Sequence, residues 1–400
     1  MKKQISALNR RNFLKTSGLT LLPGILPSIP VLAREVNEQP SPAGESIVKF
    51  YGDGESFDGP AYWEQLQQGH SKQPIKVDRY GSGGAVEDLQ KRFEAITGKE
   101  KAIYMPSGTM ANQLAIAVLS GENTKVFVQD TSHVYRDEAD AAQSVFNKRL
   151  MPLAKNETYF TMDALKQAIE NLGSEEVFKS GIGCISIENP VRRTDERMVP
   201  LEEIKKISAY CRSNNIKLHL DGARIYMAAA WSGISIKEYA SYFDTIYISL
   251  YKYLGASGGA ILCGDKELIS KMPHQIKIHG GNMYGNWLNA AMALHRLEGV
   301  EDRLQQAIKR SEEVFASLNK IKGVGINSLD GGTNIYEMNL MPDIKLQKLA
   351  EHLSSNSFIR IVPRVDEKGN VKITVNETLL YRDTNYIINA FKEAIKTAGS

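Results

Sequence analysis

Three polar residues at the ends of two expected strands have the types and spacing that chemistry on a bound carbonyl compound requires. Lys252 follows an apolar run at 245–249, and Asp221 ends another at 217–221, with Arg224 three residues later. In open α/β sheets, ligands bind just beyond the carboxyl ends of the strands. A lysine removed from water there has a lowered pKa, which lets its amine form a Schiff base with a carbonyl group. An aspartate beside a pyridine nitrogen keeps that nitrogen protonated, so that the ring can withdraw electrons from a carbanion.

Each of these residues also has an ordinary structural interpretation. Most lysines beside a strand are simply solvated. Asp221 can cap the helix expected to begin near Ala223. Arg224, in the first turn of that helix, can hold a substrate carboxylate with two hydrogen bonds or form a surface salt bridge. The small residues at 255–259 leave room for a bulky ligand near the backbone.

Two further segments supply what a phosphate-bearing ring needs. Ser107, Gly108 and Thr109 stand between an expected strand and a helix. Backbone N–H groups at a helix start, with two hydroxyls, make a phosphate site, although an isolated Ser-Gly-Thr more often only caps a helix. His133 follows the next expected strand, where its imidazole can stack on a ring, although a lone loop histidine is more often solvated or capping. Together these residues predict a site for pyridoxal 5'-phosphate (PLP), with Lys252 as its Schiff-base lysine.

Apolar periodicity predicts the scaffold that positions these residues. Expected strands lie at 101–105, 124–128, 182–187, 217–221, 244–249 and 259–263, and expected helices at 84–97, 107–119, 161–172 and 200–214. Strands that alternate with helices indicate a parallel sheet with both faces covered. From about residue 282 the pattern changes to helices at 286–298 and 301–320. Strands at 334–340, 358–362 and 371–375 and a last helix at 384–397 follow. The expected fold class is α/β, with a large parallel-sheet domain at 47–300 and a small C-terminal α+β domain at 301–400.

From about residue 48 to its end the chain resembles the threonine aldolase branch of the β-eliminating lyases, which are PLP-dependent enzymes of the aspartate aminotransferase fold. The likeness is carried by MPSGTMANQ at 105–113, SIEN at 186–189, LDGARI at 220–225 and SLYKYLGA at 249–256. It implies a PLP-dependent transferase fold and the cofactor roles given above for Lys252, Asp221 and His133. It also implies that Ser107, Gly108 and Thr109 hold phosphate. Lys277, which keeps a basic position of the family, is implied to contact the cofactor.

On the substrate side, the resemblance implies that Arg224 meets the carboxylate, but several family residues are replaced. Gly52 stands where the family has a serine that helps to hold the carboxylate, and Val191 stands where a histidine lies near the substrate hydroxyl. Lys372 aligns with a late arginine that also grips the carboxylate. An Arg-to-Lys change is not conservative at a bidentate site, and valine cannot transfer a proton.

Assembly is implied by the resemblance alone. The family forms dimers or tetramers with active sites shared between subunits, so a homodimer or homotetramer is expected. Tyr80, in DRYG at 78–81, matches a tyrosine near such a boundary. Tyr284 stands in place of a family arginine. The expected substrate-binding residues are therefore Gly52, Tyr80, Arg224 and Lys372.

The composition of the chain limits the classes of protein to which it can belong. The chain has 400 residues, 42% of them hydrophobic and 24% charged, which suits a globular protein with a large core. Its net charge of +3 comes from residues 1–34, which hold six basic residues and no acidic one. The remainder is slightly acidic, so nothing suggests a nucleic-acid or anionic-membrane surface. Cys184, Cys211 and Cys263 show no metal-binding spacing and no disulfide framework, and no metal site is expected.

The first 33 residues resemble a twin-arginine signal peptide. Arg10 and Arg11 precede Phe-Leu-Lys and a modestly apolar run from Leu19 to Ala33, which prolines break. The run is too short and too rich in proline for a membrane span. The resemblance implies export of the folded protein to the periplasm, with no membrane attachment afterwards. Residues 34–46 read as a linker, and an uncleaved anchor or a tail is the alternative.

These observations lead to three functional hypotheses. The first is a PLP-dependent lyase that acts on an amino acid, with threonine-aldolase-like carbon–carbon cleavage of a β-hydroxy amino acid. The second keeps the cofactor but changes the reaction to β-elimination, transamination or racemisation of another amine. The third is a PLP-binding protein that has lost catalysis. The retained Lys252, Asp221, His133 and Thr109 argue against the third hypothesis.

Overall fold

The computed structural model describes residues 46–367 and 369–399. The expected signal peptide and almost all of the expected linker lie outside the described residues, so export stays a prediction. Within the part that is described, no helix combines the length and the apolar character needed to cross a membrane.

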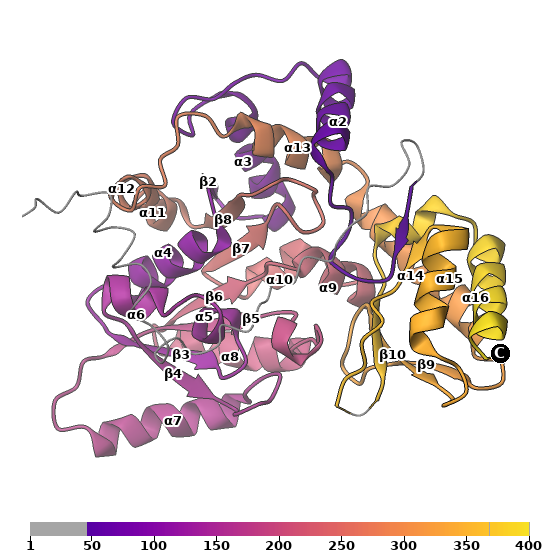
Figure 1. Cartoon of the computed structure of the whole chain (residues 1–400). Helices are drawn as coiled ribbons and strands as arrows, with labels where there is room; N and C mark the ends of the chain where they lie inside the picture. Colours follow the sequence, from indigo (N-terminus) through magenta and orange to yellow (C-terminus); the bar gives the residue numbers. More distant parts are fainter. Residues whose placement is uncertain (1–45, 368, 400) are drawn as a thin grey trace, which may run out of the picture. The chain divides into compact units, whose positions relative to one another are not determined.

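A seven-stranded sheet in the order β2-β8-β7-β6-β5-β3-β4 organises the part of the chain that precedes residue 300 (Figure 1). Its strands are β2 (Lys101–Met105), β3 (Lys125–Gln129), β4 (Arg149–Leu153), β5 (Ile182–Glu188), β6 (Lys217–Asp221), β7 (Thr245–Ser249) and β8 (Ala260–Gly264). All neighbours from β4 to β7 pair in parallel, as expected. The exception is β8, which is antiparallel to both β7 and β2. Only ten residues join β7 to β8, too few for the helical crossover that parallel neighbours need.

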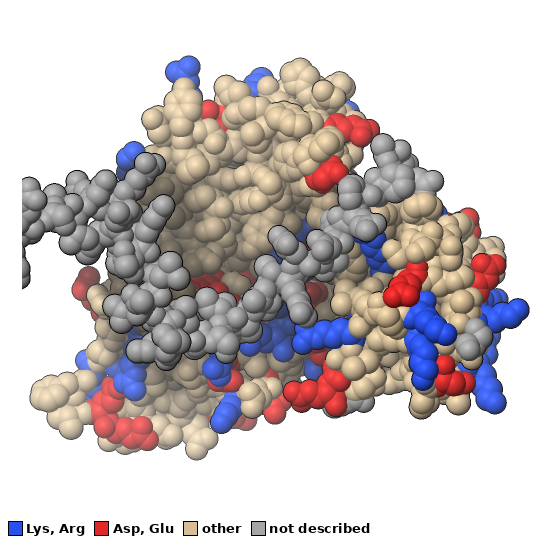
Figure 2. Space-filling view, viewed as in Figure 1, with Lys and Arg blue, Asp and Glu red and all other residues tan. Residues whose placement is uncertain are grey.

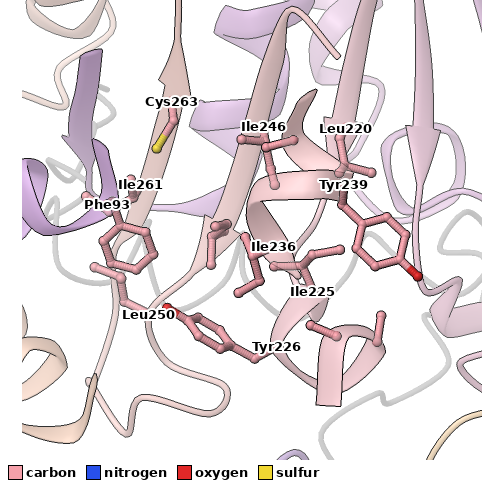
Figure 3. Close-up of a cluster of buried hydrophobic side chains, with 14 of the residues drawn as sticks. Phe93, Leu220, Ile225, Tyr226, Ile236, Tyr239, Ile246, Leu250, Ile261 and Cys263 are labelled. Carbon is pink, nitrogen blue, oxygen red and sulfur yellow. The ribbon is translucent and has the colours of Figure 1, made fainter. Parts of the chain in front are cut away.

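Helices cover both faces of this sheet. One face packs on α3 (Gly84–Thr97), α8 (Leu201–Ser213), α9 (Ile225–Ser232), α10 (Ile236–Ser241) and α13 (Trp287–Leu297). Figure 3 shows part of this core, to which α3 contributes Phe93, α9 contributes Tyr226 and β7 contributes Ile246. The other face packs mainly on α4 (Gly108–Ser120), α6 (Ala141–Phe146), α11 (Lys266–Ile269) and α12 (Met272–Ile278). Every residue of β7 is therefore buried. Burial of each isoleucine side chain stabilises the folded state by roughly 1.5–3 kcal/mol.

Three more helices complete this part of the chain. They are α2 (Gly59–Lys72), α5 (His133–Arg136) and α7 (Met162–Glu175), with a short 3₁₀ turn at Arg192–Thr194. Asp58 caps α2, and Ser107 caps α4 by accepting a hydrogen bond from the N–H of Met110. These side-chain caps satisfy N–H groups that would otherwise lack partners at the helix starts.

The C-terminal part is α+β, as expected. It contains α14 (Val300–Leu318), α15 (Leu346–Ser357) and α16 (Thr384–Ala398), and an antiparallel sheet of β9 (Val324–Ser328), β10 (Ile335–Leu340) and β12 (Val371–Thr374) in the order β12-β10-β9. A 3₁₀ turn spans Glu377–Tyr381. The expected strand at 358–362 shrinks to β11 (Ile359–Arg360), which pairs in parallel with β1 (Val48–Lys49). The first described strand, β1, therefore packs with the C-terminal elements. We had expected the residues from 47 onward to belong to the large domain.

Candidate active site

A cavity of about 240 Å³ lies where β5, β6 and β7 end, and the predicted cofactor residues meet there. It is lined by seven predicted residues: Ser107, Gly108, Thr109, His133, Asp221, Arg224 and Lys252. Glu138, Glu188, Tyr247, Tyr251 and residues 257–259 also line it. The residues come from six separate segments of the chain, and the parallel sheet brings them together because its strands end at one edge.

The start of α4 forms one wall of the cavity. Gly108 stands at the first position of this helix, where a Cβ atom would lie 2.0 Å from the hydroxyl oxygen of Tyr247. Only glycine therefore lets the backbone and the Tyr247 ring approach this closely. The free N–H groups and the positive end of the helix dipole at this point favour an anion.

Asp221 is 2% exposed and has partners for both of its carboxylate oxygens. The N–H of Ala223 donates to Oδ1 over 3.1 Å, and the side-chain amide of Asn112 donates to Oδ2 over 2.9 Å. The same Asn112 nitrogen donates to Oε1 of Glu138 over 2.8 Å. One amide group thus holds two buried carboxylates in place.

His219 supports this amide through a further buried hydrogen bond. Its Nε2 lies 3.0 Å from Oδ1 of Asn112, and its Nδ1 lies 2.8 Å from the hydroxyl of Thr245. An amide oxygen can only accept, so Nε2 carries the hydrogen and Nδ1 accepts from Thr245. Burial lowers the pKa of His219 to about 4, which agrees with this neutral tautomer.

His133 also lines the cavity and joins this network through Glu138. Its Nδ1 lies 2.9 Å from Oε1 of Glu138, and its backbone N–H donates to Oε2 of Glu188 over 2.6 Å. Burial lowers the imidazole pKa, but the hydrogen bond to Glu138 and the nearby Asp221 outweigh it, so the pKa of His133 is raised. Burial, together with the charge of Asp221, raises the pKa of Glu188 to about 7. Polar atoms of His133, Glu138 and Asp221 lie within 4.8 Å of one another.

Lys252 follows β7 and lines the same cavity. Burial lowers its pKa to about 8, and the positive charge of Arg224 adds to this shift. The carboxylates of Asp53 and Asp221 act in the opposite direction. Near neutral pH an appreciable part of this amine is therefore uncharged and nucleophilic.

Arg224 is held by two carboxylates of its own chain. Asp53 accepts from Nε over 2.5 Å and from Nη2 over 3.1 Å, and Oε1 of Glu196 lies 3.1 Å from Nε. Despite its burial, Asp53 has a lowered pKa because of Arg224, whereas burial and the charge of Asp53 raise the pKa of Glu196 to about 7. Oε2 of Glu196 is buried, and no described residue forms a hydrogen bond with it.

The other predicted residues lie outside the cavity. Lys372 has its Nζ 2.6 Å from Oε1 of Glu337 and 3.2 Å from Oδ2 of Asp195, so acidic side chains of its own chain already hold it. Gly52 contributes a carbonyl oxygen to the side-chain amide of Asn376 over 3.2 Å, and a glycine has no side chain to offer a substrate.

Tyr80 and Lys277 lie together at the surface, also away from the cavity. Tyr80 is 55% exposed, packs edge-on against Tyr284 and lies 5.6 Å below the ammonium of Lys277. Both residues were expected to reach the site. Lys277 lies on α12, which places its side chain at the surface beside Tyr80 and outside the cavity. A role for either residue across a subunit boundary stays a prediction.

Sequence reasoning missed the residues that support the site. Asn112, Glu138, Glu188, His219 and Glu196 have no spacing that marks them in the sequence. Asn112 and Glu188 do lie within the stretches that carry the family resemblance, which was their one available signal. Val191, by contrast, is fully buried in the hydrophobic core, and its N–H donates to the carbonyl of Arg197.

A protein-family model and several known proteins are similar to this chain. A family model described as beta-eliminating lyase matches residues 68–340. The chain is 35% identical over 212 residues to a low-specificity L-threonine aldolase of Candida albicans. The aligned residues make up 52% of this chain and 56% of that protein. It is 26% identical over 331 residues to low-specificity L-threonine aldolase 1 of Arabidopsis thaliana, covering 81% and 90%. The chain therefore spans little more than half the length of the Candida relative, but most of the length of the Arabidopsis one.

Solved structures show the same fold. A putative aromatic amino acid beta-eliminating lyase/threonine aldolase from Exiguobacterium superposes with a TM-score of 0.74 at 24% identity, over 88% of this chain and 98% of that one. The expected PLP-dependent transferase fold is thereby confirmed. Identity at this level supports the fold alone, so the chemistry depends on the residues of the cavity.

Proposed function

The chain belongs to the beta-eliminating lyase family, and from this premise we propose that it is a PLP-dependent lyase that cleaves the Cα–Cβ bond of a β-hydroxy amino acid. The observation that carries the proposal is that Lys252, Asp221 and the start of α4 line one cavity. The threonine aldolase names of its relatives give further support.

The residues of the cavity fit PLP. The backbone N–H groups at Gly108 and Thr109, with the hydroxyls of Ser107 and Thr109, would hold the phosphate. Asp221 would face the ring nitrogen, His133 would lie against the ring, and Nζ of Lys252 would hold the aldehyde carbon. When bound, PLP supplies an electron-withdrawing ring that stabilises negative charge on Cα of an amino acid.

The chain's own residues prepare this chemistry. Asn112 and the N–H of Ala223 fix the orientation of the Asp221 carboxylate. Nζ of Lys252 has a pKa of about 8, so it can both take and return a proton near neutral pH. Arg224 offers a guanidinium to the substrate carboxylate.

A second reaction class has one specific observation in its favour. Cleavage of Cα–Cβ requires removal of the proton from the substrate's β-hydroxyl. Val191, at the position of the family histidine, is buried in the core and has no group that accepts a proton. Racemisation, transamination or β-elimination at the same cavity needs no such acceptor. Glycine and an aldehyde as products would establish the aldolase reaction, whereas pyruvate or another keto acid would establish one of the alternatives.

The proposal is tested with purified protein, PLP and L-threonine at pH 7. We expect a visible absorption band from the covalently held cofactor, and release of glycine and acetaldehyde. Lys252→Ala should lose the band and the activity, while Lys322→Ala, which changes an exposed lysine, should keep both. An unchanged band in Lys252→Ala would refute the proposed cofactor attachment. An intact band without any aldehyde would refute the aldolase reaction.

Assembly as a homodimer or homotetramer is part of this proposal. It is supported by the exposed side chains of Tyr80, Ile278, Met283 and Tyr284. On the face that Figure 2 shows, uncharged residues also cover most of the hollowed upper part. Sedimentation of the purified protein would reveal a monomer if this part is wrong.

A further inference from the structure

The segment that carries Glu196 has an unusual backbone. Asp195 and Glu196 are consecutive and both have left-handed φ angles, 57° and 55°, which residues other than glycine rarely adopt. Two hydrogen bonds hold Glu196 there: its N–H donates to the carbonyl of Val191 over 3.0 Å, and its own carbonyl accepts from the hydroxyl of Thr333 over 2.9 Å. Such strain persists where the surrounding structure enforces it, and it concentrates at functional sites.

The result of this backbone is an excess of negative charge around Arg224. One guanidinium faces the carboxylates of both Asp53 and Glu196. The side chains of Arg224 and Glu196 are only 11% and 8% exposed, so water screens these charges weakly. An amino acid that places its carboxylate at Arg224 brings a third negative charge to a guanidinium that already faces two.

We propose that Glu196 is a substrate-binding residue that takes up one proton from solvent when the substrate's carboxylate binds at Arg224. The proton bonds to Oε2 of Glu196, and the neutral carboxyl group donates it in a hydrogen bond to the incoming carboxylate. It returns to solvent when the carboxylate product leaves. This inference rests on the proposed function, because it assumes that the substrate is an amino acid.

Oε2 of Glu196 is suited to this role. It is buried and has no hydrogen-bond partner among the described residues, although buried polar atoms usually have one. The hydroxyl of Tyr253 is likewise buried and unpartnered. A protonated Oε2 and a substrate carboxylate would complete each other's hydrogen bonding.

The charged groups around Glu196 set the pH range of the effect. Asp53 lies before α2, Arg224 before α9, Lys252 and Tyr253 after β7, and Glu188 at the end of β5. Burial raises the pKa of Glu196 to about 7, and the charges of Asp53 and Glu188 add to the rise, while Arg224 and Lys252 oppose it. Below this pKa the site already carries the proton that binding needs. Above it, binding must take the proton from solvent and therefore weakens as the pH rises.

The test compares wild-type holoenzyme with Glu196→Gln, whose side-chain amide is neutral at every pH. The dissociation constant of glycine is measured between pH 6 and 9 from the change in the cofactor's absorption. Groups on glycine and on PLP titrate equally in both proteins, so they cancel in the ratio of the two constants. We expect this ratio, wild type over Glu196→Gln, to rise by roughly tenfold for each pH unit above 7. Glu202→Gln, which alters an exposed glutamate of α8, should follow the wild type.

A ratio that stays constant between pH 6 and 9 would overturn the proposal. If Glu196→Gln does not bind PLP, Glu196→Asp keeps a titratable carboxyl, and its glycine affinity should retain a pH dependence whose midpoint is shifted from the wild type's. An affinity in Glu196→Asp that has the wild type's own profile would overturn the proposal as well. Failure of the proposed function is distinguishable, because it appears as absence of aldehyde release from L-threonine at pH 7, where no Glu196 variant is involved.

Discussion

The two sides of the cavity differ in how their buried charges are satisfied. On the cofactor side, Asp221 and Glu138 share the amide of Asn112, which His219 supports in turn. On the substrate side, Asp53 and Glu196 share one guanidinium, and an oxygen of Glu196 has no partner among the described residues. The first side is complete without a substrate, whereas the second is complete only when a further group binds.

This difference shows how one cavity can combine a fixed site with an adjustable one. The side-chain amide of Asn112 holds the carboxylates of Asp221 and Glu138 in a set orientation, and His133 adds a second partner to Glu138. Opposite charges in unequal number hold the substrate side, so its state depends on pH and on what binds. A buried group with its full set of partners resists rearrangement, whereas an unpartnered one makes binding of a partner favourable.

The largest expected effect comes from removing the shared cation on the substrate side. Arg224→Met removes the one cation that contacts the carboxylates of both Asp53 and Glu196, and the free energy of unfolding at pH 8 should fall by about 3–5 kcal/mol. Urea denaturation of the cofactor-free protein measures this. Adding Asp53→Asn and Glu196→Gln to Arg224→Met should restore most of the loss.

Arg193→Met is the matched control for this prediction. Arg193 pairs with Asp137, but it is 42% exposed and Arg192 also contacts that carboxylate. Its removal should cost less than about 1 kcal/mol. If Arg224→Met cost no more than this control, the two carboxylates would not depend on Arg224, and the contrast between the two sides would disappear.

A smaller loss is expected from the neutral link on the cofactor side. Asn112→Ala removes the donors to Asp221 and Glu138 and the acceptor of His219, and each buried group left unpaired costs roughly 1–3 kcal/mol before water or rearrangement replaces its partner. We expect a net loss of about 1–3 kcal/mol in urea denaturation. Asn123→Ala, which removes an exposed amide with one bond to the carbonyl of Ile182, should have little effect. Equal stability of the two variants would show that Asn112 does not hold the network.

The sequence predicted that the residues of the proposed cofactor side lie together, because strand ends mark them. Lys252 and His133 follow the strands β7 and β3, Asp221 ends β6, and parallel strands end at the same edge of a sheet. The expected bounds of β2 and β6 agree with the structure to the residue. The residues that support this side were not predicted, because Asn112 and Asp221 are 109 positions apart and nothing in either segment indicates the contact.

The substrate side was predicted less completely, for a related reason. Arg224 and Asp53 are 171 positions apart, and Glu196 reaches Arg224 through two left-handed residues that no apolar pattern indicates. The C-terminal part shows the same limit. The strand β9 contains Gly325 and Asn327, which have low strand propensity, and it was not expected. The expected strand at 358–362 is only two residues long, because it pairs with β1 alone.

The smallest expected effect is a shift in the pKa of Lys252 that is caused by the charges of the substrate side. Only its neutral amine captures the aldehyde of PLP, so the rate at which cofactor-free protein gains the visible band should rise with pH and level off above about 8, the pKa of Lys252. Rapid mixing with PLP between pH 6 and 10 measures this profile. Arg224 lowers that pKa, while Asp53 raises it. In Arg224→Met the midpoint should therefore move upward, by about one pH unit if the charge acts at the strength usual for a close neighbour. A midpoint that did not move would mean that the charges of the substrate side do not reach the lysine, and that the two sides work independently of each other.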